Sequence, residues 1–469
     1  MLFTSLAFLF FFPVVCVVYY LLPLRFRWVY LLFVSYYFYV NWQPAYALLL
    51  FTTTITTYFC GRYIDNHRAS QHKNRWALRI GCLIPLGILF FYKYYNFINA
   101  SVFMLLDSVG IRWLLPEMKL LMPVGISFYT FMAISYVVDI YKGTVGAERN
   151  FGIYALFVSF FPQVTSGPIG RADALIPQLK YPELLSHENV MEGLKQMLWG
   201  YFMKLCIADR VAIYVDAVYA NLDHHNGTTL LLASILYTFQ IYCDFAGYSL
   251  IAIGAARIMG IRLAENFRRP YLSRSIREFW GRWHITLSTW FRDYVYIPLG
   301  GNRVPQFRHL WNLMVTFLVS GLWHGAAWTF ILWGGVHGFF QIIETLWRQY
   351  KPRNLGFEIH PLFKIAATFA CVNFAWIFFR TPDIQTAWQV ISVSCTSFGL
   401  PFTNISVFTM GGVSLLLLIV KELHEEYGWG ISLLGSRSFI VSHLTVVLLA
   451  AYIVLFGVLD GGQFIYSQF

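Results

Sequence analysis

The sequence predicts an all-α protein: a polytopic bundle of about eleven or twelve transmembrane helices, with further re-entrant or interfacial helices. Two observations predict this fold. Of the 469 residues, 58% are hydrophobic and only 12% are charged, whereas a soluble domain carries about 25% charged residues. Apolar stretches of about 20 residues, the length that a membrane-spanning helix requires, recur along the whole chain. We therefore expect one integral-membrane domain over residues 1–469.

The candidate spans follow one another with short polar connections. They are residues 3–22, 27–42, 44–60, 80–98, 118–140, 151–166, 195–219, 228–260, 311–343, 362–379, 405–420 and 438–458. Residues 311–343 are too long for one span, because their helix would approach about 50 Å against a bilayer core of about 30 Å. A broken or tilted helix is predicted there by four glycines, Gly321, Gly325, Gly334 and Gly335. Breaks at membrane depth occur where the chain is packed in protein or lines a cavity.

The net charge of +11 is explained by membrane topology. The basic residues concentrate in three loops, 61–79, 262–308 and 346–364, which we place on the cytoplasmic side of a multi-pass protein. Topology and contact with lipid headgroups account for this charge, so we predict no nucleic-acid partner. The seven cysteines form no CxxC or other metal-like spacing, so we predict neither disulfides nor a metal site.

The polar segment 262–308 is too charged to span a membrane alone and too aromatic for a flexible loop. If its centre were one helix, four apolar residues would share a face, namely Trp280, Trp283, Leu287 and Trp290. Trp and Tyr favour membrane interfaces. The segment is therefore either an interfacial amphipathic helix or a cytoplasm-side re-entrant segment that lines a cavity.

His324 is the most conspicuous candidate for function. It lies in SGLWHGAAW (320–328), inside a run from Leu310 to Ile343 without Asp, Glu, Lys or Arg. An ionisable residue at membrane depth is costly and usually faces the bundle interior or a wet cavity. It is either a structural, hydrogen-bonded histidine or a catalytic, proton-relaying or metal-binding residue. Metal binding is the weakest option, because His337 lies on roughly the opposite face of a continuous helix.

Other chemistry-bearing residues give weaker signals. Asp244, in QIYCDFAGYS (240–249), is an intramembrane carboxylate that is either functional or the partner of an arginine or tyrosine side chain. Ser288 follows His284 by four residues, but no GxSxG nucleophile motif is present. General-base catalysis fits His324 best, because a neutral imidazole in an apolar pocket can take a hydroxyl proton. His284 supplies a second histidine on the neighbouring polar element.

Six motifs give the chain a family resemblance. The sequence REFWGRWHITLSTWFRDYVYIPLGGNR followed by LVSGLWHGAAWTFILWGGVHG resembles the membrane-bound O-acyltransferase family, especially its bacterial alginate O-acetylation branch. The motifs PVGISFYTF, FPQVTSGPIGRADALIPQL, QIYCDFAGYS and NFAWIFFR agree, in the same order. The resemblance covers most of the chain and implies a helical bundle around a central tunnel. It also implies that His324 is the family's WHG histidine and that His284 is its second polar position.

The resemblance implies an acetyl transfer across the bacterial inner membrane. The donor would be cytoplasmic acetyl-CoA, with no permanently bound cofactor. The acceptor would be a hydroxyl of an exported alginate- or cellulose-like polysaccharide, or an extracytoplasmic SGNH-type acetyltransferase as partner. Peptidoglycan O-acetylation, teichoic-acid D-alanyl transfer and an acyl-translocating channel without chemistry of its own are the alternatives.

Within that reaction we expect distinct roles for the candidate residues. His324 would be the general base on the acceptor hydroxyl, and His284 would orient or polarise the donor carbonyl. Basic residues suit the phosphates of acetyl-CoA, although headgroup contact is the alternative for the arginines. The predicted substrate- and donor-binding residues are Arg277, Trp280, Arg282, Trp283, Ser288, Trp323 and Asp244.

Overall fold

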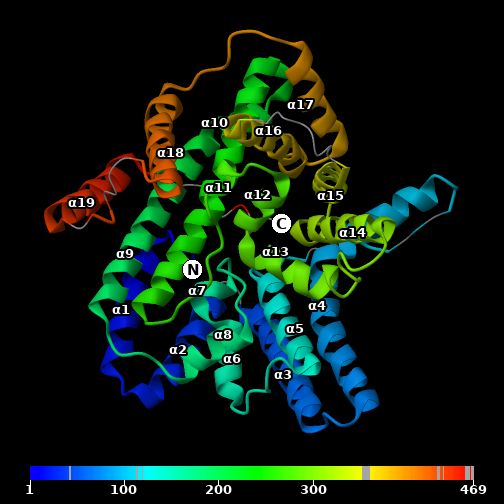
Figure 1. Ribbon diagram of the computed structural model, residues 1–469, viewed down its shortest axis with the longest axis vertical. Coiled ribbons are helices and arrows are strands. Elements are labelled where there is room, and N and C mark those ends of the chain that lie inside the picture. Colours follow the sequence, from blue (N-terminus) through cyan, green and yellow to red (C-terminus); the bar gives the residue numbers. More distant parts are fainter. Residues whose placement is uncertain are drawn as a thin grey trace. The chain divides into compact units, whose positions relative to one another are not determined.

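The computed structural model describes residues 1–41, 44–111, 113, 115–118, 120–350, 360–429, 434–436, 438–459 and 465. These residues form helices joined by loops, with no β-strand among them (Figure 1). Five described helices are long and apolar enough to cross a membrane: His72–Asp107, Gly227–Ile258, Pro361–Arg380, Val407–Tyr427 and Phe439–Phe456. The predicted class, an all-helical multi-pass membrane protein, is confirmed. The remaining predicted spans fall on shorter or more polar helices, and their number stays a prediction.

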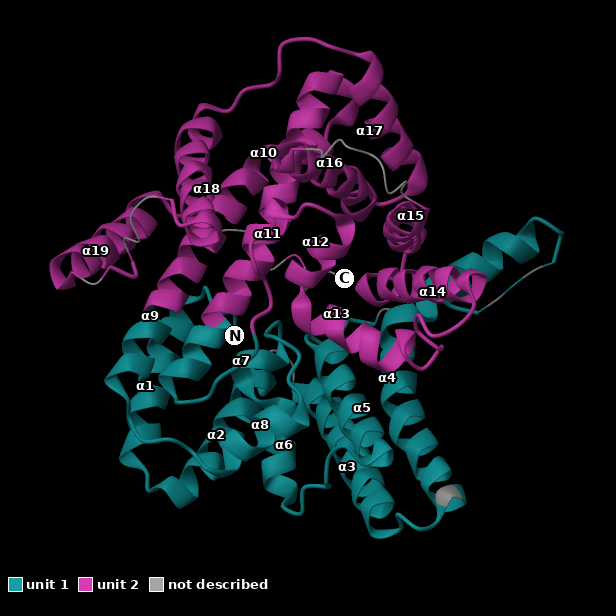
Figure 2. Ribbon diagram, in the orientation of Figure 1, with its two compact units in different colours: residues 1–194, 252–264 teal, residues 195–251, 265–469 magenta. Residues whose placement is uncertain are grey.

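The chain separates into two compact units, shown in different colours in Figure 2. Unit 1 comprises residues 1–194 and 252–264, and unit 2 comprises residues 195–251 and 265–469. The expectation of one integral-membrane domain stays a prediction. Both predicted histidines belong to unit 2.

Unit 1 is a helical bundle with a tyrosine-rich core. Helices α3, α4 and α5 pack against one another, and α2 and α8 pack against α6. In the core the rings of Tyr136 and Tyr154 lie 4.3 Å apart, and the Tyr154 hydroxyl is 2.7 Å from Thr57 Oγ1. The helices are α1 (Leu6–Leu21), α2 (Leu24–Val40), α3 (Pro44–Asn66), α4 (Gln71–Asp107), α5 (Ile126–Lys142), α6 (Phe151–Ser159), α7 (Phe161–Val164), α8 (Ala172–Lys180) and the start of α9 (His187–Tyr201).

Unit 2 contains most of the polar segment 262–308 and all or most of four of the five helices that are long and apolar enough to cross a membrane. Its elements are the end of α9, the π-helix η1 (Phe202–Ala208), α10 (Asp209–Tyr219), η2 (Leu222–His224), most of α11 (Gly227–Ile258), η3 (Pro270–Leu272), α12 (Ile276–Arg282), α13 (Ile285–Phe291), η4 (Arg292–Tyr296), α14 (Gln306–His324), α15 (Trp328–Tyr350), α16 (Pro361–Arg380), α17 (Ile384–Thr396), η5 (Val407–Gly411), α18 (Gly412–Tyr427) and α19 (Phe439–Phe456). The Ser275 side chain starts α12 by accepting a hydrogen bond from the Glu278 backbone N–H.

The long apolar stretch 311–343 is broken, as the sequence predicts. Helix α14 ends at His324, and α15 begins at Trp328 and packs against it. Gly325 makes the break possible, because a Cβ at that position would lie 2.0 Å from the Phe330 ring. The hairpin thus holds His324 at a helix end.

Two glycines bring the helices of this hairpin into backbone contact. A Cβ on Gly334 would lie 2.2 Å from the Phe317 carbonyl oxygen, and one on Gly321 would lie 2.2 Å from that of Phe330. Small residues at a membrane helix interface allow such close approach.

We expect Gly334→Ala to destabilise the protein. The added methyl group must push α14 and α15 apart, and overpacking of this kind costs about 1–3 kcal/mol. Thermal unfolding in detergent measures the effect. Gly335→Ala is the matched control, because its Cβ would meet only Leu318 Cδ2, at an ordinary 3.6 Å. Equal melting temperatures for the two variants would contradict a backbone contact at Gly334.

The centre of the polar segment does not form one continuous helix. Helix α12 ends at Arg282, Trp283 is extended and His284 adopts a left-handed conformation with φ 42° and ψ 55°. At the end of α12 the Arg282 carbonyl accepts a hydrogen bond from the backbone N–H of Arg268, a residue outside the helix. Trp280, Trp283, Leu287 and Trp290 therefore do not lie on one helix, so the shared face that a single helix would give them is not formed.

Candidate active site

His284 is buried and held by Asn266. The His284 side chain is 0% exposed, and its Nδ1 lies 3.0 Å from Asn266 Oδ1. The Asn266 backbone carbonyl accepts a hydrogen bond from Ile285 N–H at 2.9 Å. Burial lowers the pKa of His284 from 6.5 to about 3, so the imidazole is neutral near pH 7.

The two predicted histidines share one tryptophan neighbour. The Trp323 ring centroid lies 6.0 Å from that of His284 and 4.9 Å from that of His324. His324 is 2% exposed and also meets the rings of Trp333 at 4.9 Å and Phe379 at 5.5 Å. Unit 2 therefore places His284, Trp323 and His324 in one aromatic site.

Segments far apart in the sequence build the walls of this site. QIYCDFAGYS contributes Phe245, whose ring lies 4.6 Å from His284. NFAWIFFR contributes Phe379 and also Trp376, whose ring lies 5.0 Å from that of Trp283 and 5.6 Å from that of Trp333. Four of the recognised motifs thus meet in this site, these two and the two that carry the histidines, and they enclose the imidazoles in an apolar environment.

Trp280 belongs to the same aromatic cluster but is hydrogen-bonded to a third histidine. Its Nε1–H donates to His337 Nδ1 at 3.3 Å, and both residues are buried. The sequence argument against a metal site at His324 and His337 assumed that one continuous helix carries both residues. They lie on two helices, α14 and α15, so that argument does not apply. His337 contacts the Trp333 ring, as does His324, so the two histidines approach the same tryptophan.

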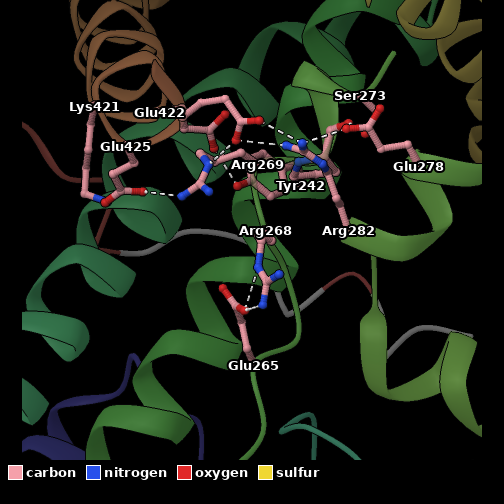
Figure 3. A network of polar contacts seen from close by, with 12 residues as sticks. Tyr242, Glu265, Arg268, Arg269, Ser273, Glu278, Arg282, Lys421, Glu422 and Glu425 are labelled. Atoms are coloured by element: carbon pink, nitrogen blue, oxygen red, sulfur yellow. Dashed lines mark hydrogen bonds and ion pairs between the residues drawn. The ribbon is translucent and has the colours of Figure 1, made fainter. Parts of the chain in front are cut away.

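Arg282 lies in an ion network between the polar segment and α18 (Figure 3). Its guanidinium donates to both carboxylate oxygens of Glu426, at 2.7 and 3.0 Å, and to Glu278 at 2.6 Å. Arg269 donates to the same Glu426 at 2.8 Å and to Glu425 at 3.3 Å. Bidentate pairs of this kind fix orientation strongly. The network therefore ties the segment that carries His284 to α18.

The remaining donor-binding candidates lie apart from the histidines or make other bonds. The Arg277 side chain is exposed, and its backbone N–H donates to Glu344. The Ser288 hydroxyl donates to the Trp283 carbonyl at 3.3 Å. Asp244 Oδ1 lies 2.6 Å from Lys204 Nζ, and Asp244 Oδ2 accepts a hydrogen bond from Ile465 N–H.

Asp244 belongs to a buried ion cluster that the sequence did not reveal. Lys204 Nζ lies 2.6 Å from Asp244 and 2.7 Å from Asp209, and all three side chains are almost fully buried. Lys204 lies in η1, a π-helical stretch inside the predicted span 195–219. Such stretches often mark functional sites.

Sequence reasoning missed Asn266 as well. It stands in ENFRRP, 18 residues before His284, without a motif that signals a histidine partner. The one available hint is its place near the start of the polar segment 262–308, beside the apolar Phe267.

The chain belongs to the membrane-bound O-acyltransferase family, whose model matches residues 147–380. The protein is thus an O-acyltransferase of the multi-pass membrane class. It is 38% identical, over 95% of its length, to the probable alginate O-acetylase AlgI of Azotobacter vinelandii, covering 87% of that protein. Identity is 39% over 90% of the chain to the probable AlgI of Pseudomonas aeruginosa, covering 81% of it. The chain is 33% identical, over 77% of its length, to the peptidoglycan O-acetyltransferase of Helicobacter pylori, and the match covers 72% of that protein.

Proposed function

We propose that this protein moves an acetyl group from cytoplasmic acetyl-CoA to a hydroxyl of an exported polysaccharide of the alginate or cellulose-like class. The membrane would be the bacterial inner membrane. One observation carries the proposal: two buried histidines meet one tryptophan in an aromatic site. Similarity to alginate O-acetylases over 95% of the chain supports the choice of acceptor.

His324 is the general base in the proposed reaction. It takes the proton of the acceptor hydroxyl while the hydroxyl oxygen forms a bond to the thioester carbonyl carbon. The carbon–sulfur bond then breaks, and His324 returns the proton to the departing thiolate. The apolar rings around His324 exclude water, which would otherwise hydrolyse the thioester.

The arginines divide into two roles in this proposal. The exposed Arg277 meets the phosphates of acetyl-CoA, whereas Arg282, bound by Glu278 and Glu426, keeps the His284 segment in place. Trp280, Trp283 and Trp323 form the apolar wall for the acyl group. An extracytoplasmic SGNH-type acetyltransferase is the partner that would carry the acetyl group onward if the polymer is not acetylated directly.

Purified protein in liposomes, given acetyl-CoA with a labelled acetyl group, tests the proposal. We expect thioester cleavage and an acetyl ester on added alginate oligosaccharides, both lowered about a hundredfold or more in His324→Gln. Peptidoglycan fragments and D-alanyl thioester donors, supplied in parallel, test the two other acceptor and donor classes. Passage of label across the membrane without thioester cleavage would contradict the proposal and indicate a channel.

A further inference from the structure

We infer that Asn266 is a positioning residue that holds His284 as the Nδ1–H tautomer, so that His284 offers Nε2 to the substrate as a hydrogen-bond acceptor. The tautomer follows from the contacts of Asn266 alone. The part that Nε2 then plays rests on the proposed function.

The orientation of the Asn266 side-chain amide is set by its neighbours. The Thr286 backbone N–H, which can only donate, points at Oδ1 from 3.4 Å, and the Thr286 hydroxyl donates to the same atom at 2.9 Å. On the other side, Asn266 Nδ2 donates to Ser249 Oγ at 3.1 Å. The amide atom that faces His284 is therefore the oxygen.

An amide oxygen can only accept, so His284 Nδ1 must carry the proton in the 3.0 Å contact. A neutral imidazole has a single ring proton, which leaves a lone pair on Nε2. The buried position of His284 keeps the ring neutral near pH 7. In functional histidines generally, the hydrogen bond that one ring nitrogen makes determines which of the two nitrogens carries the proton.

The backbone supports the same conclusion. His284 is one of two described residues other than glycine with positive φ, a conformation that persists only where surrounding contacts impose it. The Asn266 carbonyl bonds the next residue, Ile285, and its side chain bonds the ring. One residue thus sets both the direction of the imidazole and its protonated nitrogen.

This tautomer changes the role expected for His284. A thioester carbonyl oxygen can only accept, so the Nε2 lone pair cannot polarise it. Of the two reacting groups, the hydroxyl is the one with a proton to donate. His284 therefore lies on the side of the hydroxylated acceptor and takes a hydrogen bond from another of its hydroxyl groups, while His324 removes the single proton of the attacking hydroxyl.

Solid-state NMR of the full-length protein in lipid bilayers, labelled with ¹⁵N,¹³C-histidine, tests the inference. Signals absent from His284→Gln identify His284. At neutral pH we expect a protonated Nδ1 and an unprotonated Nε2. Asn266→Leu, similar in volume but unable to accept, should lose this preference and show mixed tautomers. Thr286→Val, which removes a different bond to Asn266, should keep the wild-type pattern.

A proton on Nε2 in the wild type would overturn the inference, as would an unchanged tautomer in Asn266→Leu. These outcomes are separate from the fate of the proposed function. If the wild-type protein transfers acetyl groups but His284 Nε2 is protonated, only the role of Asn266 is refuted. The expected tautomer in a protein that cleaves no acetyl-CoA refutes only the proposed reaction.

Discussion

Replacing His324 by glutamine is expected to lower acetyl transfer about a hundredfold to ten-thousandfold, the usual contribution of a general base. Glutamine fills similar space but cannot take a proton. The residue is buried among the rings of Trp323, Trp333 and Phe379, so water has little access to replace the imidazole. The acetyl content of the exported polymer, normalised to the amount of protein in the membrane, measures the loss.

His337→Gln is the matched control, because His337 is also buried and lies on the same helical hairpin. We expect it to retain at least ten times the activity of His324→Gln, about 1.4 kcal/mol in barrier height. Normal acetylation in His324→Gln would refute the general-base role. Equal losses in both variants would show that packing alone explains the effect.

Lys204→Met is expected to destabilise the protein by about 3–5 kcal/mol, the cost of leaving buried charge without its partner. The change leaves the carboxylates of Asp209 and Asp244, which both contact Lys204 Nζ, buried together without a cation. Thermal unfolding in detergent and the amount of protein in the membrane measure the effect.

Two further variants make the test specific. Combining Lys204→Met with Asp209→Asn and Asp244→Asn removes all three charges and should restore much of the stability. Lys421→Met removes the partly exposed partner of Glu425 and should cost about 1 kcal/mol or less, as for a surface pair. A Lys204→Met protein that melts with the wild type would show that the cluster does not stabilise the fold.

The helices and the break in the hairpin could be predicted because they depend on local sequence. Long apolar runs specify the spans, and Gly325 marks the break because any side chain there meets Phe330. The turn at His284 could not be predicted. Trp283 and His284 have no local preference for a break, and the left-handed backbone is imposed by hydrogen bonds from residues 266–268.

The histidines of the site were visible in the sequence, whereas their supporting contacts were not. His324 stands out as an ionisable residue in an apolar run, and motif resemblance identifies His284. Asn266 and Lys204 acquire meaning only through tertiary contacts, with His284 and with Asp244 respectively. Arg282 shows the converse: its charge favoured a phosphate site, and the fold gives it two carboxylate partners.

The left-handed backbone at His284 limits how heat resistance can be engineered at this position. An L-residue in this conformation costs about 1–2 kcal/mol relative to glycine, and His284 is held there with φ 42°. Glycine would relieve that strain but would leave a cavity in place of the buried imidazole, and the loss of a large buried side chain costs about 2–5 kcal/mol. Engineering a more robust enzyme must spare this strained residue and seek its gains elsewhere.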